Sequence, residues 1–250
     1  MKNSTRIRNK KIIIIGAILL TLVLVFILNI IFFKGNFEKA KEIWGRVDVG
    51  GMFHNEACEQ MRSRVEEMIS TGEYELIVEK CRAVIERNDG AIKEMEEAKS
   101  NFVIRVGLER FQKSYERAKT IQMEQERLYT VWHKFYLKFV ENATINAGAD
   151  KLTEAAKILK ESGNSELAGF GEEWLEKRKA LTEAYNKFHS ADYGVESYEK
   201  NSADYQAALK SYEEWYYNNK INIAEVAQVD SGMEIDLQTR YEELKKYLNE

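Results

Sequence analysis

The feature that most constrains this chain is an uncharged apolar run from Ile12 to Phe33. At 1.5 Å per residue, a helix of that length covers roughly 33 Å, enough to cross a hydrocarbon core of about 30 Å. A cleavable signal sequence has a shorter apolar region followed by small residues, whereas this run continues into "KGNFE" at 34–38. We therefore expect residues 12–33 to be retained as a single transmembrane anchor.

The charges that flank the apolar run predict its orientation. Five basic residues and no acidic ones precede it: Lys2, Arg6, Arg8, Lys10 and Lys11. The residues that follow the run mix both signs. The positive-inside rule therefore favours residues 1–11 as a short cytoplasmic leader, with the rest of the chain outside the cell membrane.

Composition bounds the part of the chain that follows the leader. Of the 37 basic residues, five precede the run, so residues 12–250 carry 32 basic against 41 acidic side chains, a net charge of about −9. A nucleic-acid-binding protein would show a basic surface instead, so we expect no nucleic-acid partner. Proline is absent and alternating apolar patterns are scarce, which predicts an all-α fold.

The glycine positions suggest how the chain is divided. Residues 34–53 are expected to form a juxtamembrane helix and a hinge, because "WGRVDVGGMF" at 44–53 contains two adjacent glycines and no helical period. Residues 54–250 would then form the extracytoplasmic helical domain. Its first two helices are predicted over 54–70 and 74–88, with Gly90 of "NDG" ending the second.

A long heptad pattern follows between residues 91 and 144. Its positions are Ile104, Leu108, Phe111, Tyr115, Ala118, Gln122, Gln125, Tyr129, Trp132, Tyr136 and Phe139. Such a seam predicts one long helix packed against others, and segments 150–162, 165–190, 196–218 and 233–249 could cover it as an antiparallel bundle. The seam could also pair two copies of the chain as a homo-oligomer. Gln122 and Gln125 are expected to lie within it and fix its register.

A short internal repeat offers an alternative architecture. "SADYGVESYEK" at 190–200 is followed by "SADYQAALKSYEEW" at 202–215, and "GEYELIVEKCRAVIERNDGA" occupies 72–91. The segments 72–91 and 202–217 resemble the second helix of a tetratricopeptide repeat, in which a small residue, a polar residue and a tyrosine open the helix. The resemblance implies an array of helical hairpins in place of a plain antiparallel bundle.

No catalytic, cofactor-binding or metal-binding residues are predicted. The three histidines are far apart in sequence and none belongs to an H-E-x-x-H motif. No G-x-S-x-G motif occurs, and the G-x-G of "LAGFGEEW" at 167–174 lacks the preceding strand of a dinucleotide site, so a local helix distortion is expected there. His54, Cys58 and Cys81 could hold zinc, but a helix cap and two core thiols explain them better.

The two cysteines are expected to be unpaired. If the first two helices turn about Thr71 and Gly72, Cys81 is offset from Cys58 by about 6 Å along the axis. With packed helices about 8–10 Å apart, the α-carbons would lie about 10 Å apart, beyond the limit of about 7 Å for a disulfide. A staggered hairpin would close that gap, so a bridge remains the alternative.

The aromatic residues near the C-terminus supply the candidate binding site. Tyr198, Tyr205 and Tyr212 recur every seven residues, which is typical of a core stripe. Trp215 and Tyr217 lie beside the stripe and are the candidate partner-binding residues. The sequence thus favours a membrane-anchored scaffold or adaptor that binds a protein partner, without catalysis. The alternative is a cell-wall glycan-binding module that uses the aromatics near Trp215.

Overall fold

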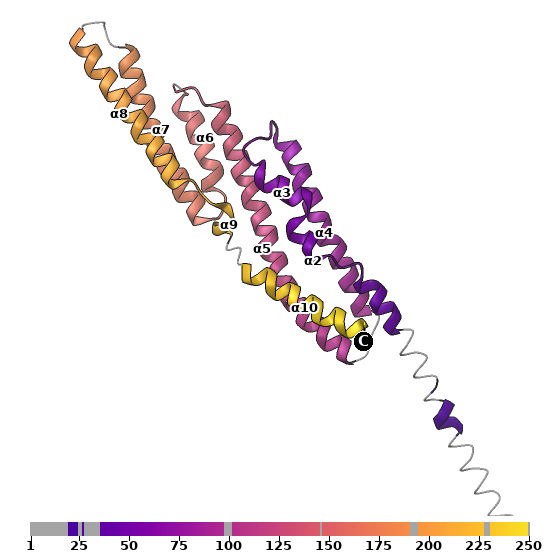
Figure 1. The fold of residues 1–250 in the computed structure, drawn as a ribbon. Coiled ribbons are helices and arrows are strands. Elements are labelled where there is room, and N and C mark those ends of the chain that lie inside the picture. The colour runs from indigo at the N-terminus through magenta and orange to yellow at the C-terminus, as the bar shows by residue number, and fades with distance from the viewer. Residues whose placement is uncertain are drawn as a thin grey trace, which may run out of the picture. The chain divides into compact units, whose positions relative to one another are not determined.

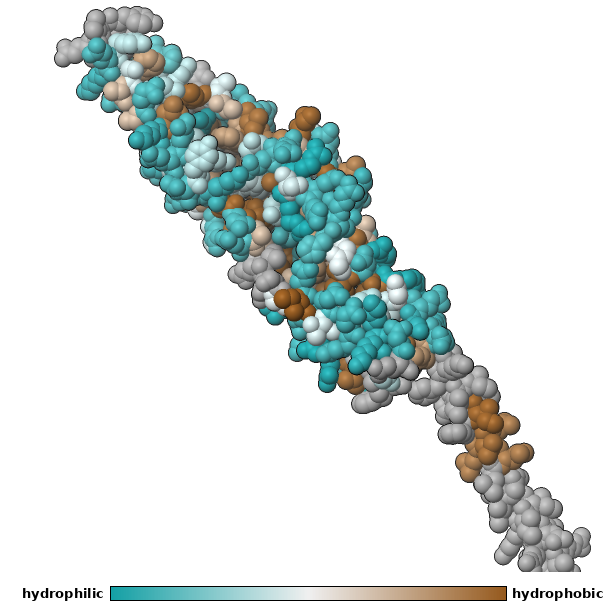
Figure 2. All heavy atoms as spheres, in the orientation of Figure 1, coloured by the Kyte–Doolittle hydropathy of each residue, from teal (hydrophilic) through white to brown (hydrophobic). Residues whose placement is uncertain are grey.

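The computed structural model describes residues 20–24, 27, 36–97, 102–145, 147–190, 195–227 and 231–249. These residues form helices and no strand, which confirms the all-α helical bundle (Figure 1). The predicted leader and most of the predicted anchor at 12–33 lie outside the described residues. The described part of the run, 20–24 and 27, is helical and forms a hydrophobic group in Figure 2.

No helix among the described residues is both long enough and apolar enough to cross a membrane. The transmembrane anchor therefore stays a prediction. Residues 36–44 are also helical. The helices that follow them are α2 Val49–His54, α3 Glu56–Ser63, α4 Thr71–Glu97, α5 Phe102–Glu141, α6 Ala149–Lys160, α7 Ser165–Ser190, α8 Val195–Asn219, α9 Ile223–Val226 and α10 Ser231–Asn249. The helices expected over 150–162, 165–190, 196–218 and 233–249 are confirmed as α6, α7, α8 and α10.

The chain forms two compact units. Unit 1 consists of Met1–Val49, Glu86–Tyr115 and Asp236–Glu250, and unit 2 consists of Gly50–Ile85 and Glu116–Ile235. In unit 1 the ring of Trp44 packs edge-on against Phe111, with centroids 4.7 Å apart, and stacks on Tyr241 at 5.2 Å. Three stretches that are far apart in sequence thus build one aromatic core.

Part of the segment 44–53, where no helix is expected and a hinge is predicted, is helical. Residues 49–54 form α2, so Gly50 and Gly51 are helical, and the side chains of Trp44, Val47 and Met52 are buried. Burial of these apolar side chains offsets the entropy that two glycines lose in a helix. The predicted boundary between a juxtamembrane segment and a domain at residue 54 stays a prediction.

The helix end expected at "NDG" is wrong, because α4 continues through Gly90 to Glu97. The buried amide of Asn88 accepts a hydrogen bond from the backbone N–H of Asp48 (2.8 Å) and donates one to its carbonyl (3.0 Å). The carboxylate of Asp89 accepts a hydrogen bond from the Tyr115 hydroxyl (2.9 Å). These tertiary contacts offset the cost of about 1 kcal/mol that a glycine carries within a helix.

The heptad seam of α5 is packed by other segments of the same chain. Its buried members are Leu108, Phe111, Tyr115, Ala118, Gln122, Gln125 and Trp132, whereas Tyr129, Tyr136 and Phe139 are half-buried. The predicted burial of Gln122 and Gln125 is confirmed. Pairing of two copies through the seam stays a prediction.

In unit 2, α6 packs on α7 and α7 packs on α8 as successive hairpins, coloured from salmon (α6) to orange (α7 and α8) in Figure 1. Their core joins Trp132 and Phe135 of α5 to Phe170 and Trp174 of α7. The helix α7 is continuous through Gly169 and Gly171, so the expected distortion is absent. The two tetratricopeptide-like segments lie within α4 and α8, and the repeat array itself stays a prediction.

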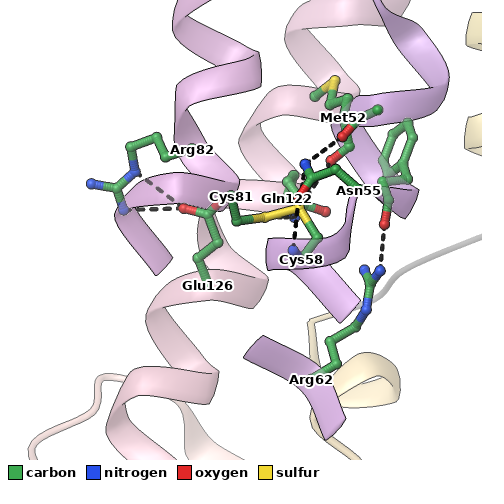
Figure 3. Close-up of a disulfide and its surroundings, with 10 residues drawn as sticks. Met52, Asn55, Cys58, Arg62, Cys81, Arg82, Gln122 and Glu126 are labelled. Carbon is green, nitrogen blue, oxygen red and sulfur yellow. Dashed lines mark hydrogen bonds and ion pairs between the residues drawn. A yellow bond between two sulfur atoms is a disulfide. The ribbon is translucent and has the colours of Figure 1, made fainter. Parts of the chain in front are cut away.

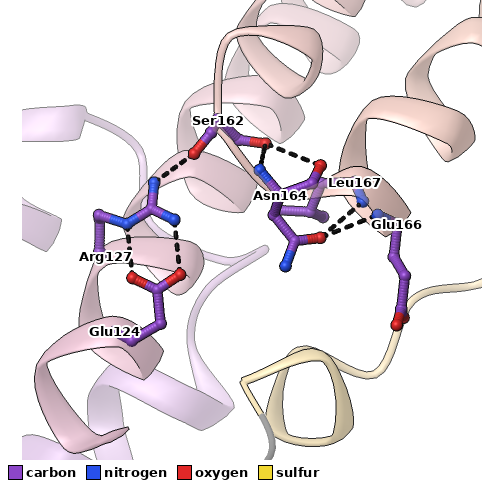
Figure 4. Close-up of polar contacts among 6 residues, drawn as sticks. All are labelled: Glu124, Arg127, Ser162, Asn164, Glu166 and Leu167. Carbon is purple, nitrogen blue, oxygen red and sulfur yellow. Dashed lines mark hydrogen bonds and ion pairs between the residues drawn. The ribbon is translucent and has the colours of Figure 1, made fainter. Parts of the chain in front are cut away.

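The loop between α6 and α7 is fixed by polar contacts (Figure 4). The Asn164 side chain caps α7 by accepting hydrogen bonds from the backbone N–H groups of Glu166 (3.0 Å) and Leu167 (3.1 Å). Arg127 of α5 donates to the carbonyl of Ser162 (2.5 Å). Gly163 occupies the left-handed region with φ of 75°, which glycine adopts without steric cost.

The prediction of two free cysteines is wrong, because Cys58 and Cys81 form a disulfide with α-carbons 4.8 Å apart (Figure 3). The first helix was expected to extend to Ser70, but α3 ends at Ser63 and a turn occupies residues 64–67. The shortened arm places Cys58 level with Cys81. Gln122 of the seam directs its amide nitrogen toward both sulfurs, at 3.9 and 3.6 Å.

Candidate functional site

The candidate site is a cleft in unit 2 with a volume of about 600 Å³, which we call the α5 cleft. It is lined by the loop after α3, one face of α5, and the segment between α8 and α9. The lining residues are Arg62, Ser63, Val65, Glu66, Glu67, Tyr129, Trp132, Tyr136, Lys220, Ile221, Asn222 and Ile223. The volume falls in the range typical of pockets that bind ligands.

A buried histidine positions the loop that forms one wall of the α5 cleft. The Nδ1 atom of His133 lies 2.6 Å from the carbonyl oxygen of Val65, and its Nε2 atom lies 3.3 Å from that of Ser70. The imidazole also stacks on Tyr74 with ring centroids 4.2 Å apart. The hydroxyl of Tyr74 in turn donates to the carbonyl of Met61 (2.5 Å) at the end of α3. Both ends of the loop are thereby tied to α4 and α5.

Glu66 links the three walls of the α5 cleft. Its carboxylate accepts a hydrogen bond from the indole N–H of Trp132 (3.2 Å) and pairs with the ammonium group of Lys220 (3.1 Å). Lys220 follows α8 directly, 154 residues from Glu66. The contact therefore joins the α3 loop, α5 and the segment after α8 at one carboxylate.

The α5 residues that line the cleft form its floor. Two tyrosines are the part of this floor that a ligand can reach. Tyr129 and Tyr136 are half-buried and lie seven residues, or about 10 Å, apart on one face of α5. Neither hydroxyl has a hydrogen-bond partner among the residues that the structure describes. Burial raises the pKa of the Tyr129 hydroxyl, against an opposing effect of Arg62, so this group stays protonated and can donate.

A second cleft of about 410 Å³, the α7 cleft, lies on the other side of the segment after α8. It is lined by Glu166, Gly169, Phe170, Glu173, Asn219, Lys220, Ile221, Asn222, Glu225 and Val226. Residues Lys220, Ile221 and Asn222 line both clefts.

The structure places the two predicted binding residues differently. Trp215 is half-buried: its ring stacks on Phe170 at 5.2 Å, and its indole N–H donates to Glu173 (3.0 Å). Tyr217 is 79% exposed and contacts Tyr216 edge-on. Trp215 thus supports two residues that line the α7 cleft, whereas Tyr217 lines neither cleft.

Two buried charged residues lie outside the clefts, and each is held by contacts within the chain. The guanidinium of Arg178 donates to the carbonyls of Asn142 and Thr144, both at 3.4 Å, where α5 ends, and lies 5.4 Å from the centre of the Tyr212 ring. Burial lowers the pKa of Arg178. The other group is Glu126, which pairs with Arg82. Within the described ranges, no three His, Cys, Asp or Glu side chains are grouped as a metal site would require.

Comparison of the chain with protein-family models, with curated proteins and with solved structures finds no match. The functional interpretation therefore depends on the two clefts. Sequence reasoning missed the α5 cleft because Glu66 and Lys220 carry no local motif. The only sequence signal for it was the seven-residue spacing of Tyr129 and Tyr136, which was interpreted as seam packing.

Proposed function

We propose that this protein is a membrane-anchored helical adaptor that binds a protein partner outside the cytoplasm, without catalysis of its own. The observation that carries the proposal is the α5 cleft, whose lining includes two tyrosines that have no hydroxyl partner within the described part of the chain. Aromatic side chains that combine apolar area with a hydrogen-bonding group are typical of residues that anchor protein partners.

Two features support a location outside the cytoplasm. The apolar run at 12–33 follows a basic leader, which favours a retained anchor with its C-terminal side outside. The disulfide between Cys58 and Cys81 is typical of an oxidising compartment, because cytosolic thiols are kept reduced.

Site-specific photo-cross-linking in intact cells tests the proposed function. A photoreactive phenylalanine analogue replaces Asn222, which is exposed and lines both clefts, and the matched control position is Glu213, exposed on α8. We expect the same protein to be cross-linked from position 222 in repeated experiments and not from position 213. Equal labelling from both positions, or none from position 222, contradicts an adaptor that uses this surface.

Orientation is tested with a C-terminal epitope tag. Protease added to spheroplasts should remove the tag while a cytoplasmic marker stays intact. A protected tag contradicts the proposed topology. The glycan-binding alternative predicts instead that substitution of Tyr217, the most exposed of the candidate aromatics, abolishes retention on cell-wall material.

A further inference from the structure

The charged side chains that line the α5 cleft are already paired within the chain. Glu66 pairs with Lys220, and the Oε2 atom of Glu67 lies 3.8 Å from the Nε atom of Arg64. Arg62 donates a hydrogen bond to the backbone carbonyl of Phe53. An ionic ligand group would have to displace one of these contacts. The cleft is therefore suited to a ligand segment that carries no charge where it contacts the floor.

The cleft contains two aromatic hydroxyls that have no hydrogen-bond partner among the described residues, those of Tyr129 and Tyr136. Tyr129 and Tyr136 both line the cleft, at positions about 10 Å apart along the axis of α5. Between them, Trp132 is only 2% exposed and its N–H is used by Glu66. A bound segment thus meets two amphipathic rings separated by an apolar floor.

The conformation of a bound peptide follows from where its carbonyl groups are free. A helix uses its carbonyls internally except in its last turn. An added strand needs a strand edge, and the described part of the chain contains no strand. A polyproline II segment has no internal hydrogen bonds, so all its carbonyls can accept from the tyrosines, and three of its residues span about 9 Å. This period is close to the separation of Tyr129 and Tyr136.

We infer that the α5 cleft binds an uncharged, proline-rich segment of the partner in the polyproline II conformation, with prolines packed on Tyr129 and Tyr136 and backbone carbonyls bonded to their hydroxyls. This inference rests on the proposed adaptor function. The 250 residues of this chain contain no proline, so none of them can supply such a segment. The ligand segment therefore lies outside these residues.

Selection from a random dodecapeptide library tests the inference. The full chain is immobilised in detergent, and three proteins are compared: the wild type, the double variant Tyr129→Phe/Tyr136→Phe, and the matched control Tyr205→Phe. All these substitutions keep the ring and remove only the hydroxyl, and Tyr205 is half-buried like the other two tyrosines but lines neither cleft. Helical circular dichroism and melting temperature establish that all three proteins are folded.

We expect peptides with prolines three residues apart to be enriched on the wild type and on Tyr205→Phe. Synthetic versions of the enriched peptides should bind the double variant at least tenfold more weakly by fluorescence anisotropy, because two hydrogen bonds are lost. Unchanged affinity for the double variant overturns the inference. Enrichment of proline-free peptides that still require the two hydroxyls overturns it as well, but leaves the adaptor function standing.

A carbohydrate probe separates failure of the inference from failure of the function. If no peptide is enriched and an N-acetylglucosamine tetrasaccharide binds the wild type, both the proline-rich ligand and the adaptor function are wrong. If neither probe binds, the inference is wrong and the cross-linking experiment at Asn222 decides the function. Binding of proline-rich peptides with no cross-linked protein in cells contradicts the adaptor function alone.

Discussion

The carboxyl group of Glu126 is fully buried in unit 2, where one oxygen pairs with Arg82 (3.1 Å) and the other has no hydrogen-bond partner. Burial raises its pKa, and the charge of Arg82 only partly opposes this effect. A raised pKa means that the folded state holds the proton more tightly than the unfolded state. The free energy of unfolding therefore falls as pH rises from the ordinary glutamate pKa through the raised one.

We predict that Glu126→Gln stabilises the protein at pH 8 by about 1 kcal/mol, because a neutral amide does not place a charge in the core. The gain should shrink toward pH 5, where the wild-type carboxyl is more often protonated. Urea unfolding of wild type and variant at pH 8 and pH 5 measures this gain in the free energy of unfolding. The pKa values of Glu94 and Glu141 are lowered by their paired cations, so these two groups affect the free energy of unfolding at a lower pH than Glu126 does. Parallel pH profiles for wild type and variant would show that Glu126 is not the responsible group.

At the scale of the helix, two glycines of α7 differ in what surrounds them. A Cβ at Gly171 would lie 3.0 Å from the Cβ of Leu159 and 3.2 Å from the carbonyl oxygen of Ala156, both on α6. A Cβ at Gly169 would have no atom within 4 Å. The close packing of α6 on α7 therefore depends on one of the two glycines.

The substitution Gly171→Ala should lower the free energy of unfolding by about 1–3 kcal/mol, because backbone must move to admit the methyl group. Gly169→Ala is the matched control in the same helix and should raise it by about 0.5–1 kcal/mol, the gain in helix propensity. Thermal denaturation of both variants measures the difference. Equal effects of the two substitutions would mean that α6 does not depend on this close approach.

The disulfide joins α3 to α4 across 23 residues. Its reduction should lower the free energy of unfolding by about 3 kcal/mol, because the unfolded chain gains conformational freedom. Urea titrations with and without reductant measure this loss. An alkylating reagent should label neither cysteine in the unreduced, denatured protein, and both after reduction. Labelling without reductant would show that the bridge is absent.

The sequence was sufficient where a helix is determined by its own residues. The helix predicted over 165–190 is α7, and the structure shows that the neighbouring Asn164 caps its first turn. The sequence was insufficient where distant contacts decide. The glycine of "NDG" predicted a helix end at Gly90. The contact between Asn88 and Asp48, which supports the continued helix, spans 40 residues and leaves no local signal in the sequence. The α5 cleft likewise depends on Glu66 meeting Lys220 across 154 residues, a separation at which no periodicity gives a signal.

On the scale of the whole molecule, α10 supplies an essential part of unit 1 although it is the last described helix. Leu244 is buried, and its side chain passes so close to Gly107 that a Cβ there would lie 3.0 Å from it. Tyr241 of the same helix stacks on Trp44. Unit 1 should therefore respond to changes at the C-terminal end of the chain.

We predict that Leu244→Ala destabilises unit 1 by about 2–5 kcal/mol through the cavity it leaves. Hydrogen exchange followed by mass spectrometry should show faster exchange in residues 105–115 than in the wild type, with 149–190 of unit 2 less affected. Ile235→Ala, at a position 66% exposed, is the control and should leave both regions unchanged. Uniform acceleration along the chain would instead mean that the two units unfold together.

The aromatic core of unit 1 also sets an order of events during synthesis. Trp44 leaves the ribosome about 200 residues before Tyr241, which at 5–20 residues per second is a wait of roughly 10 to 40 s. The α6, α7 and α8 hairpins of unit 2 are contiguous, so they can close during that interval. Trp44 thus completes its packing only after all of unit 2 has been synthesised.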